Sequence, residues 1–251
     1  HKRNEQMKHL FLLIIMFLIS LNAQNKNPII TPTFDELIKS IVGEEKYIFD
    51  DTIVLKVPDF ADNPFQVPIY VDGTKIPNAK RMILFTDYNP IANIIDIELK
   101  ELLPIISTNI KVAQGTPLRA LILDDKNIWH VGSINIRSNG GGCDVSAQSS
   151  KDYEYEKLLG EIKIELFQKE KGTRIKTSIF HPMNTGFVFG TNEFYINSIT
   201  IKNNSKVLAD IKSTSVISEN PRFIFELKNK VDNLNIEFID NDGNNYKADI
   251  K

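Results

Sequence analysis

Residue types that mark many enzymes and nucleic-acid-binding proteins are scarce in this sequence. Its 251 residues include one cysteine, one tryptophan and four histidines. Lysine and arginine together number 30 against 32 acidic residues, which gives a formal net charge of −2. Because nucleic-acid binding requires a basic surface, this balance argues against nucleic acid as a partner. The sequence also lacks a phosphate-binding loop and a dinucleotide-binding glycine motif, so no nucleotide cofactor is expected.

Apolar runs long enough to cross a bilayer, which needs about 20 residues, are also missing. The longest, Leu10–Leu21, follows the charged Met7-Lys8-His9 and precedes the small residue Ala23. This order of charged, apolar and small residues is typical of a secretory signal peptide, and an uncleaved membrane anchor is the alternative. We therefore set residues 1–23 apart as a signal peptide with upstream residues. We expect a periplasmic protein that is not held in the membrane.

A single amphipathic helix is expected ahead of the first strands. Thr33 and Glu36 fit a capping box, and apolar residues recur at helical spacing from Phe34 to Ile41. Gly43 stands where a helix would end. The sequence therefore predicts a short helix that packs its apolar face on another element.

The hydrophobic period then changes to two, as in strands with one buried face. Ile53, Leu55 and Val57 alternate with polar residues, and turn residues separate the runs that follow. Seven short strands at this spacing predict a β-sandwich over residues 24–137. The predicted runs are Ile53–Val57, Val67–Val71, Arg81–Phe85, Asn93–Leu99, Ile105–Val112, Leu118–Leu123 and Ile128–Ile136.

A second set of strands predicts another sandwich over residues 158–251. The expected fold class is therefore all-β, with two immunoglobulin-like sandwich domains in tandem and a short N-terminal helix. With 42% hydrophobic residues, the chain has enough apolar material for both cores. The second runs are Ile162–Phe167, Ile175–Phe180, Phe194–Ile201, Val207–Ile211, Arg222–Leu227, Leu234–Phe238 and Tyr246–Ile250.

The only cysteine lies between the two predicted domains. Residues 138–157 have no apolar periodicity and include Gly140, Gly141 and Gly142 directly before Cys143. This composition predicts a flexible, solvated arm and linker. A thiol on such an arm suits covalent attachment of a substrate, because it can enter a partner's cleft. An incidental free thiol and a disulfide-linked homodimer through Cys143 remain alternatives.

Other chemistry for the thiol has little support in the spacing of its candidate partners. A cysteine hydrolase needs a thiol and an imidazole held rigidly together, which a triglycine tether opposes. His130 lies in a strand-like run and is expected to be structural. A copper site would draw on Cys143, His130, His181 and Met183, but no histidine follows the cysteine closely. We expect neither a metal nor another cofactor, and no catalytic residues.

Several motifs together resemble the SoxY and SoxZ proteins of bacterial sulfur oxidation. The segments Phe34-Asp35-Glu36-Leu37 and Asp87-Tyr88-Asn89-Pro90, together with the glycine-cysteine arm, are similar to SoxY. His181-Pro182-Met183-Asn184-Thr185-Gly186 resembles the SoxZ signature His-Pro-Met-Glu-Thr-Gly, with Asn184 in place of glutamate. Asn220-Pro221 and Asp240-Asn241-Asp242-Gly243 also resemble SoxZ. The chain is thus similar to SoxYZ-like carriers associated with quinoprotein dehydrogenases, which join both domains.

The resemblance implies a periplasmic carrier of thiosulfate-type sulfur oxidation with no enzymatic activity of its own. Cys143 would hold the intermediates covalently, and His181, Pro182, Met183 and Gly186 would form a structural turn. The implied partners are a c-type haem thiol-coupling protein, a sulfate-releasing hydrolase and a sulfane dehydrogenase, or a quinoprotein dehydrogenase. One departure is that the SoxY cysteine lies at a free C-terminus, whereas Cys143 is tethered at both ends. A non-covalent scaffold for a periplasmic dehydrogenase, with a dispensable Cys143, is the alternative function.

Overall fold

The protein is a two-layer β-structure with two short helices among the residues that are described. The computed structural model describes residues 26–142 and 153–250. The predicted all-β fold class, with one helix ahead of the strands, is confirmed. In the first half the elements are α2 (Phe34–Val42), β1 (Tyr47–Phe49), β2 (Val54–Lys56), β3 (Val67–Asp72), β4 (Arg81–Thr86), β5 (Asn93–Glu98), β6 (Leu102–Ile110), β7 (Thr116–Leu123) and β8 (Trp129–Ile136). In the second half they are α3 (Tyr153–Leu158), β9 (Ile162–Gln168), β10 (Thr173–Ile179), β11 (Asn184–Thr185), β12 (Glu193–Phe194), β13 (Ile196–Asn203), β14 (Lys206–Ser213), β15 (Arg222–Leu227), β16 (Leu234–Asp240) and β17 (Asn245–Ile250).

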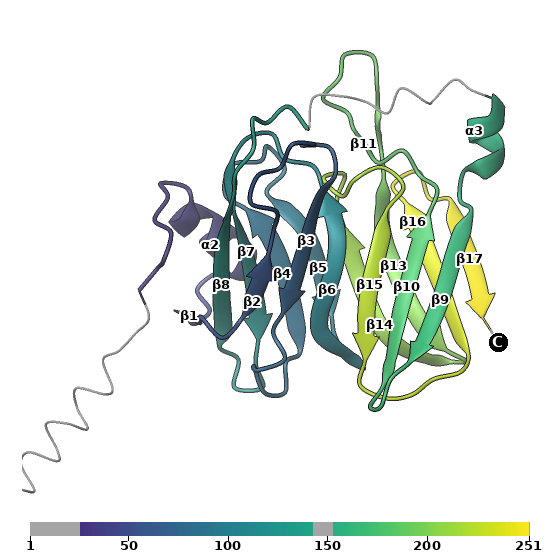
Figure 1. The fold of residues 1–251 in the computed structure, drawn as a ribbon, viewed down its shortest axis with the longest axis horizontal. Helices are drawn as coiled ribbons and strands as arrows, with labels where there is room; N and C mark the ends of the chain where they lie inside the picture. The colour runs from purple at the N-terminus through teal and green to yellow at the C-terminus, as the bar shows by residue number, and fades with distance from the viewer. Residues whose placement is uncertain (1–25, 143–152, 251) are drawn as a thin grey trace, which may run out of the picture.

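Both main sheets run through the two halves of the chain (Figure 1). The larger sheet has nine strands in the order β1-β8-β7-β4-β5-β14-β13-β16-β17, and the smaller has six in the order β2-β3-β6-β15-β10-β9. In the strand order of each main sheet, the strands of the first half stand together at one end and those of the second half at the other. The two predicted sandwiches therefore stand edge to edge rather than face to face.

The two domains are joined by two antiparallel strand pairs, one in each main sheet, and we call this contact the domain junction. In the larger sheet β5 pairs with β14, so that Ile97 lies opposite Ile211. In the smaller sheet β6 pairs with β15, so that Ser107 lies opposite Ile224. Each domain thus covers an edge strand of the other, and edge strands left open are prone to unwanted pairing. The sequence left the packing of the domains undecided, and these ladders settle it for the described residues.

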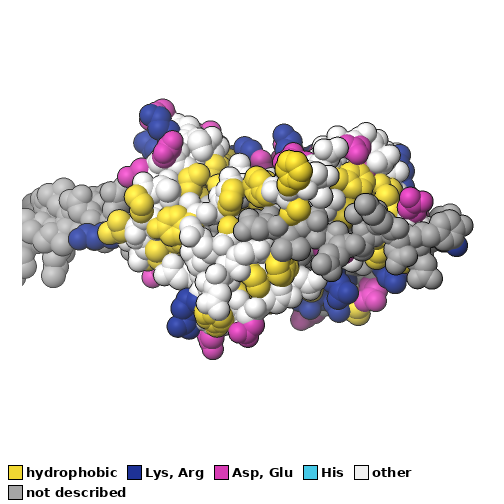
Figure 2. Space-filling model, turned by 90° about the horizontal axis from the view of Figure 1, so that it is seen from above, with side chains coloured by type: hydrophobic (Ala, Val, Ile, Leu, Met, Phe, Trp, Pro, Cys, Tyr) yellow, Lys and Arg dark blue, Asp and Glu magenta, His cyan; other side chains and the backbone are white. Residues whose placement is uncertain are grey.

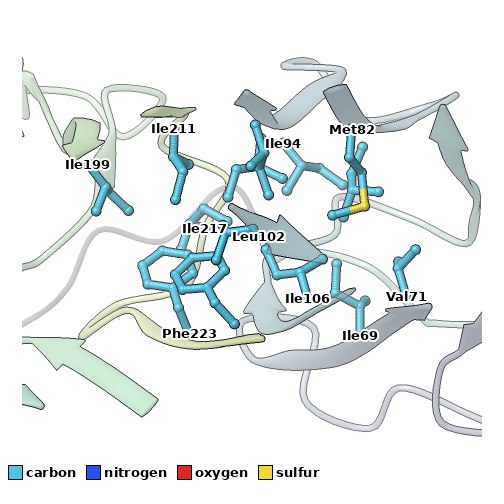
Figure 3. Packing of buried hydrophobic residues seen from close by; sticks show 14 of the residues in the cluster. Ile69, Val71, Met82, Ile94, Leu102, Ile106, Ile199, Ile211, Ile217 and Phe223 are labelled. Carbon is cyan, nitrogen blue, oxygen red and sulfur yellow. The ribbon is translucent and has the colours of Figure 1, made fainter. Parts of the chain in front are cut away.

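A single hydrophobic cluster fills the space between the sheets and crosses the junction without a break (Figure 3). Strands with alternating apolar residues supply it, as β6 shows by burying every second side chain. Ile94 and Leu102 from the first half face Ile217 and Phe223 from the second, and all four are almost completely buried. Dispersion and hydrophobic burial therefore help to hold the two domains together.

Helix α2 covers the outer face of the larger sheet, but the predicted capping box is wrong. The hydroxyl of Thr33 makes no cap hydrogen bond. It donates instead to the carbonyl oxygen of Asp87 at 3.2 Å, so a tertiary contact replaces the local cap. The helix ends at Gly43 as predicted, with φ of 68°. Its apolar face buries Phe34 against Phe85 in a second, smaller cluster.

Four short elements were not expected from the sequence. Strand β1 pairs in parallel with β8, and β11 pairs with β12 in a separate two-stranded ladder. The predicted connection over residues 138–157 ends in helix α3, which the sequence pattern does not indicate. Elements of two or three residues carry too few side chains to show a period. None of the helices in the described part of the chain has the length and apolar character of a membrane span.

Candidate functional site at the base of the glycine arm

The arm leaves the first domain at the end of β8, and its first residues are held by a neighbouring loop. Ser138 forms an isolated parallel bridge with Ala61. The Ala61 amide donates to the Arg137 carbonyl at 2.8 Å, and the Gly140 amide donates to the Ser138 hydroxyl at 3.0 Å. We call residues Ser138–Gly142 the arm base. Its start is a continuation of the sheet edge.

The three glycines of the arm base lie against the loop that follows β6. The Gly141 amide donates to the Ala113 carbonyl and the Gly142 amide to the Val112 carbonyl, each at 2.9 Å. A Cβ atom on Gly140 would stand 2.2 Å from the Ala113 oxygen, and one on Gly142 would stand 2.0 Å from the Pro64 oxygen. Glycine is therefore required at Gly140 and Gly142 for close backbone approach, a role separate from the flexibility expected from composition.

A buried amide side chain supports the loop that receives these glycines. The Nδ2 group of Asn89 donates to the Lys111 carbonyl at 2.9 Å, and its Oδ1 atom accepts the Ala113 amide at 2.9 Å. Asn89 thus brackets Val112, whose carbonyl holds Gly142. One residue of the Asp87-Tyr88-Asn89-Pro90 segment therefore fixes the acceptors of the arm base.

Lys111 joins this loop to the second domain. Its side chain is buried, and its ammonium group donates to the carbonyl oxygens of Met183 and of Ser215, the latter at 3.0 Å. Its backbone amide donates to the Val216 carbonyl at 2.7 Å. Carbonyl oxygens carry partial negative charge, so the two contacts of the ammonium group suit a buried cation. The position of the arm base is in this way tied to the second domain.

The turn that begins at His181 lies on the second-domain side of that contact. Met183 adopts a positive φ of 52° and its sulfur accepts the Ile196 amide at 3.3 Å. The Nδ1 atom of His181 accepts the Met183 amide at 3.2 Å, and Asn220 accepts the His181 amide at 3.0 Å. His181, Pro182 and Met183 are buried. These contacts give the turn a packing role at the domain junction.

Burial controls the protonation of His181. It lowers the pKa of the imidazole to about 4, because the charged ring would lose its hydration. The carboxylate of Asp240, 3.7 Å from Nε2, acts in the opposite direction, and the Lys111 charge acts in the same direction as burial. Burial alone would raise the pKa of Asp240, but hydrogen bonds from Asn244 and Tyr246 keep it below its ordinary value. The imidazole is thus neutral near pH 7.

The other histidine considered above lies far from the arm base. His130 is near the start of β8, six residues before Ile136, which corresponds to about 20 Å along a strand. Its Nδ1 atom stands 2.7 Å from an Asp50 oxygen and its Nε2 atom 3.3 Å from an Asp124 oxygen. The structure therefore does not bring His130 and His181 together. No group of three or more His, Cys, Asp or Glu side chains suited to a metal ion occurs in residues 26–142 and 153–250.

A buried ion pair holds Asp87, which directly follows β4 and lies two residues before Asn89. The Arg119 guanidinium binds both Asp87 oxygens, with Nε at 3.0 Å and Nη2 at 2.7 Å, and both side chains are fully buried. Arg119 also donates to the Ile29 carbonyl at 2.8 Å and to the Ser133 hydroxyl at 2.9 Å. The segment before helix α2 is thereby attached to the sheet. Asp87 and Asn89, two residues apart, anchor the N-terminal segment and the arm base respectively.

Sequence reasoning did not single out Lys111 or Arg119. Each is a basic residue within or at the end of an apolar strand run, and that was the only available signal. Cys143 lies outside the described residues, as do the predicted signal peptide and residues 143–152 of the connection. The role predicted for Cys143 therefore stays a prediction.

Comparison with known families follows the division seen in the structure. Residues 38–143 match the family model "Sulfur oxidation protein SoxY", and residues 163–251 match "Sulphur oxidation protein SoxZ". The chain belongs to the SoxY and SoxZ families, joined in one polypeptide. The SoxY match ends at Cys143, so it includes the arm base, and the SoxZ match includes the His181 turn.

Solved structures give weaker similarities. The sulfur carrier protein SoxY from Chlorobium limicola f thiosulfatophilum is 20% identical with a TM-score of 0.39, and the alignment covers 42% of this chain and 96% of that one. A glycosyl hydrolase family 2 member from Bacteroides cellulosilyticus DSM 14838 is 10% identical with a TM-score of 0.20, covering 80% of this chain and 29% of that one. A search of curated proteins finds no match. The assignment therefore rests on the two family models.

Proposed function

We propose that this SoxY–SoxZ fusion is a carrier of sulfur-compound oxidation that holds pathway intermediates on the thiol of Cys143. The observation that carries the proposal is the fixed arm base. Gly142, the residue before Cys143, is buried and bonded to the Val112 carbonyl at 2.9 Å. The chain therefore starts towards Cys143 from one defined point of a rigid two-domain body. A carrier needs such a point, because its partners must find the same thiol repeatedly.

The proposed chemistry is that implied by the family resemblance. In loading, the Cys143 sulfur bonds to the outer sulfur of thiosulfate, and the thiol proton and two electrons leave. A c-type haem thiol-coupling enzyme accepts the electrons. In the next step, water attacks the terminal sulfonate sulfur, sulfate is released, and a persulfide stays on the cysteine. A sulfane dehydrogenase then oxidises the remaining sulfur. A quinoprotein dehydrogenase is the other class of partner that we consider.

The carrier supplies position in this scheme, and its partners supply catalysis. His181 and Met183 are buried at the domain junction, and His130 lies at the far end of its strand. His181 is therefore assigned to packing in this proposal, and His130 is about 20 Å along its strand from the arm base.

Location and self-association are further parts of the proposal. We infer export to the periplasm by the signal peptide in residues 1–23, because the sulfur compounds and haem partners of this scheme are met outside the cytoplasm. An oxidising compartment would also permit a disulfide-linked homodimer through Cys143. Such a dimer would block loading, so it would be a resting form.

Intact-mass spectrometry of the exported protein tests this function. Protein is isolated from cells grown on a reduced sulfur compound and analysed before and after reductant, with Cys143→Ser as the matched control. We expect a reductant-labile increment on the wild type and none on the variant. The size of the increment identifies the cargo, and a doubled mass identifies the disulfide dimer. A thiol that stays unmodified under every growth condition would contradict the carrier and favour the scaffold.

A further inference from the structure

Two phenylalanine side chains project into solvent from the SoxZ domain. They lie in the loop between β11 and β12, where Phe187 is 46% exposed and Phe189 is fully exposed. Large apolar groups on a soluble protein cost free energy unless a partner covers them, and grouped aromatic side chains often mark interaction sites. We call residues Gly186–Gly190 the aromatic finger. Figure 1 shows this loop rising above the sheets beside label β11.

The finger is built to hold its aromatic rings outward. The Val188 carbonyl accepts both the Thr191 amide at 3.0 Å and the Thr191 hydroxyl at 2.7 Å, which closes the tip into a tight turn. At the root, Asn184 pairs with Phe194 and Thr185 with Glu193. A loop backbone that is held in one place loses little conformational freedom when a partner binds it. The finger is therefore pre-organised for binding.

The finger and the arm base stand at the same end of the molecule, and Lys111 fixes their relation. The finger follows the His181 turn, and the Met183 carbonyl of that turn accepts a hydrogen bond from Lys111. The neighbouring Val112 carbonyl holds Gly142. A protein that reaches for the group beyond Gly142 therefore meets the finger at a set position. Figure 2 looks down on this end and shows hydrophobic side chains over both halves of the molecule.

A groove on the SoxY domain adds to the same surface. It adjoins Ser138 of the arm base and is lined by Phe60, Tyr88 and Pro117 together with Ile30, which is 89% exposed. The arm base thus lies between an apolar groove on one domain and an aromatic finger on the other. Because apolar surfaces lie on both sides of the arm base, they suit a partner whose binding surface is wider than the arm.

The exposed charged side chains at this end of the molecule indicate what kind of surface the partner presents. The loops around the finger and arm base expose four carboxylates, Asp59, Asp62, Glu193 and Asp242. Among the described residues of these loops and the adjoining strand ends, the exposed cations are Arg137, whose Nε donates to the Asp59 carbonyl at 2.9 Å, and Arg222 at the start of β15. A partner that covers this end must therefore present cationic groups around an apolar socket.

We propose that the aromatic finger is a docking element for the enzyme that loads the arm, inserting Phe187 and Phe189 into an apolar socket with a cationic rim. This inference rests on the proposed function, because it takes the loading enzyme as the occupant. It adds that recognition is shared between the arm and a fixed contact on the SoxZ domain. Binding should therefore persist when the thiol is absent.

The test measures binding and loading separately. Binding of the purified c-type haem thiol-coupling enzyme is titrated against the full chain carrying Cys143→Ser, with and without the double change Phe187→Ser and Phe189→Ser. We expect the dissociation constant to rise at least tenfold, as for the loss of central aromatic contacts. The matched control is Phe167→Ser, which removes a side chain of similar exposure, 41%, from β9. It should leave binding unchanged.

Additional measurements test which partner binds the aromatic finger and exclude unfolding of the variants. All variants should keep the wild-type melting temperature, and in the background with Cys143 intact they should react with iodoacetamide at the wild-type rate. Replacing Glu193 and Asp242 by lysine should weaken binding severalfold at low salt. An unchanged dissociation constant for the double variant would overturn the docking element, as would self-association that the same change abolishes. Failure of the wild type to acquire a mass increment would instead count against the carrier alone, because binding is measured without the thiol.

Discussion

Two buried cations of the SoxY domain, Arg119 and Lys111, are held in different ways. Arg119 forms a two-point ion pair with Asp87 inside its own domain and also holds the N-terminal segment through Ile29. A guanidinium and a carboxylate match in geometry, and the pair removes the cost of burying either charge alone. Arg119 therefore needs nothing from the SoxZ domain.

Lys111 takes two acceptors from the SoxZ domain. Its ammonium group donates to the carbonyl oxygens of Met183 and Ser215, which belong to loops of the other domain. A lysine buried against carbonyl groups is stable only where those groups are brought to it. The ion pair of Arg119 is thus complete within the SoxY domain, whereas the loop at Val112, which holds the arm base, is positioned by contacts between the SoxY and SoxZ domains. Three measurements test this difference between the two cations.

The largest effect is expected from Asp87→Ala, which leaves Arg119 buried without its carboxylate. Loss of one partner of a buried pair costs about 3 to 5 kcal/mol of unfolding free energy, which urea denaturation measures. The matched control is Asp96→Ala, because the Arg81–Asp96 pair has the same bidentate form but is partly exposed. An exposed pair contributes up to about 1 kcal/mol. Equal losses in the two variants would contradict the anchoring role of Asp87.

The sequence predicted the strands well because their side chains carry the period of a half-buried sheet. In β6 every second residue is buried, as the alternation in Ile105–Val112 indicates. The edge-to-edge joining of β5 with β14 could not be predicted, since alternation shows which face of a strand is buried and not which distant strand it pairs with. The capping box failed for a related reason, as Thr33 found its partner in Asp87, 54 residues away.

The candidate site was predictable in its composition and not in its geometry. Consecutive glycines indicate either freedom or close backbone approach, and only the acceptors on Val112 and Ala113 decide between them. Those acceptors come from a loop that is distant in sequence. Phe187 and Phe189 were visible as aromatic residues between glycines, but exposure depends on which surface the fold leaves uncovered. The residues that join the two domains therefore needed the structure.

A second, smaller effect is expected from pH, through His181. The pKa of its ring is about 4 in the folded protein and near 6.5 in the unfolded chain. Between these values the unfolded state binds more protons, so stability is complete above pH 6.5 and falls as the pH approaches 4. The shift corresponds to about 3 kcal/mol. The lowered pKa of Asp240 adds to the same loss at lower pH, as protonation of its carboxylate then also favours the unfolded state.

Urea unfolding at several pH values between 4 and 7 checks this dependence, with His181→Gln as the variant that should flatten it. A ring that titrates by NMR at its ordinary pKa would contradict the buried, neutral histidine. The comparison of the two cations sharpens the test. Lys111 lies close enough to lower the pKa of His181, so Lys111→Met should raise that pKa, whereas Asp87→Ala should leave it unchanged.

The smallest loss of stability is expected from Lys111→Met itself, about 1 to 3 kcal/mol, because neutral carbonyl oxygens of Met183 and Ser215 are left without this donor. Its distinctive effect is local. Hydrogen exchange at the amides of Gly141 and Gly142 should accelerate more than the global loss of stability requires, since Val112 follows Lys111 directly. The matched control is Lys212→Met, an exposed lysine on the junction strand β14. If both variants left these two amides equally protected, the arm base would be an independent property of the SoxY domain, and Lys111 would hold the domains together without setting the start of the arm.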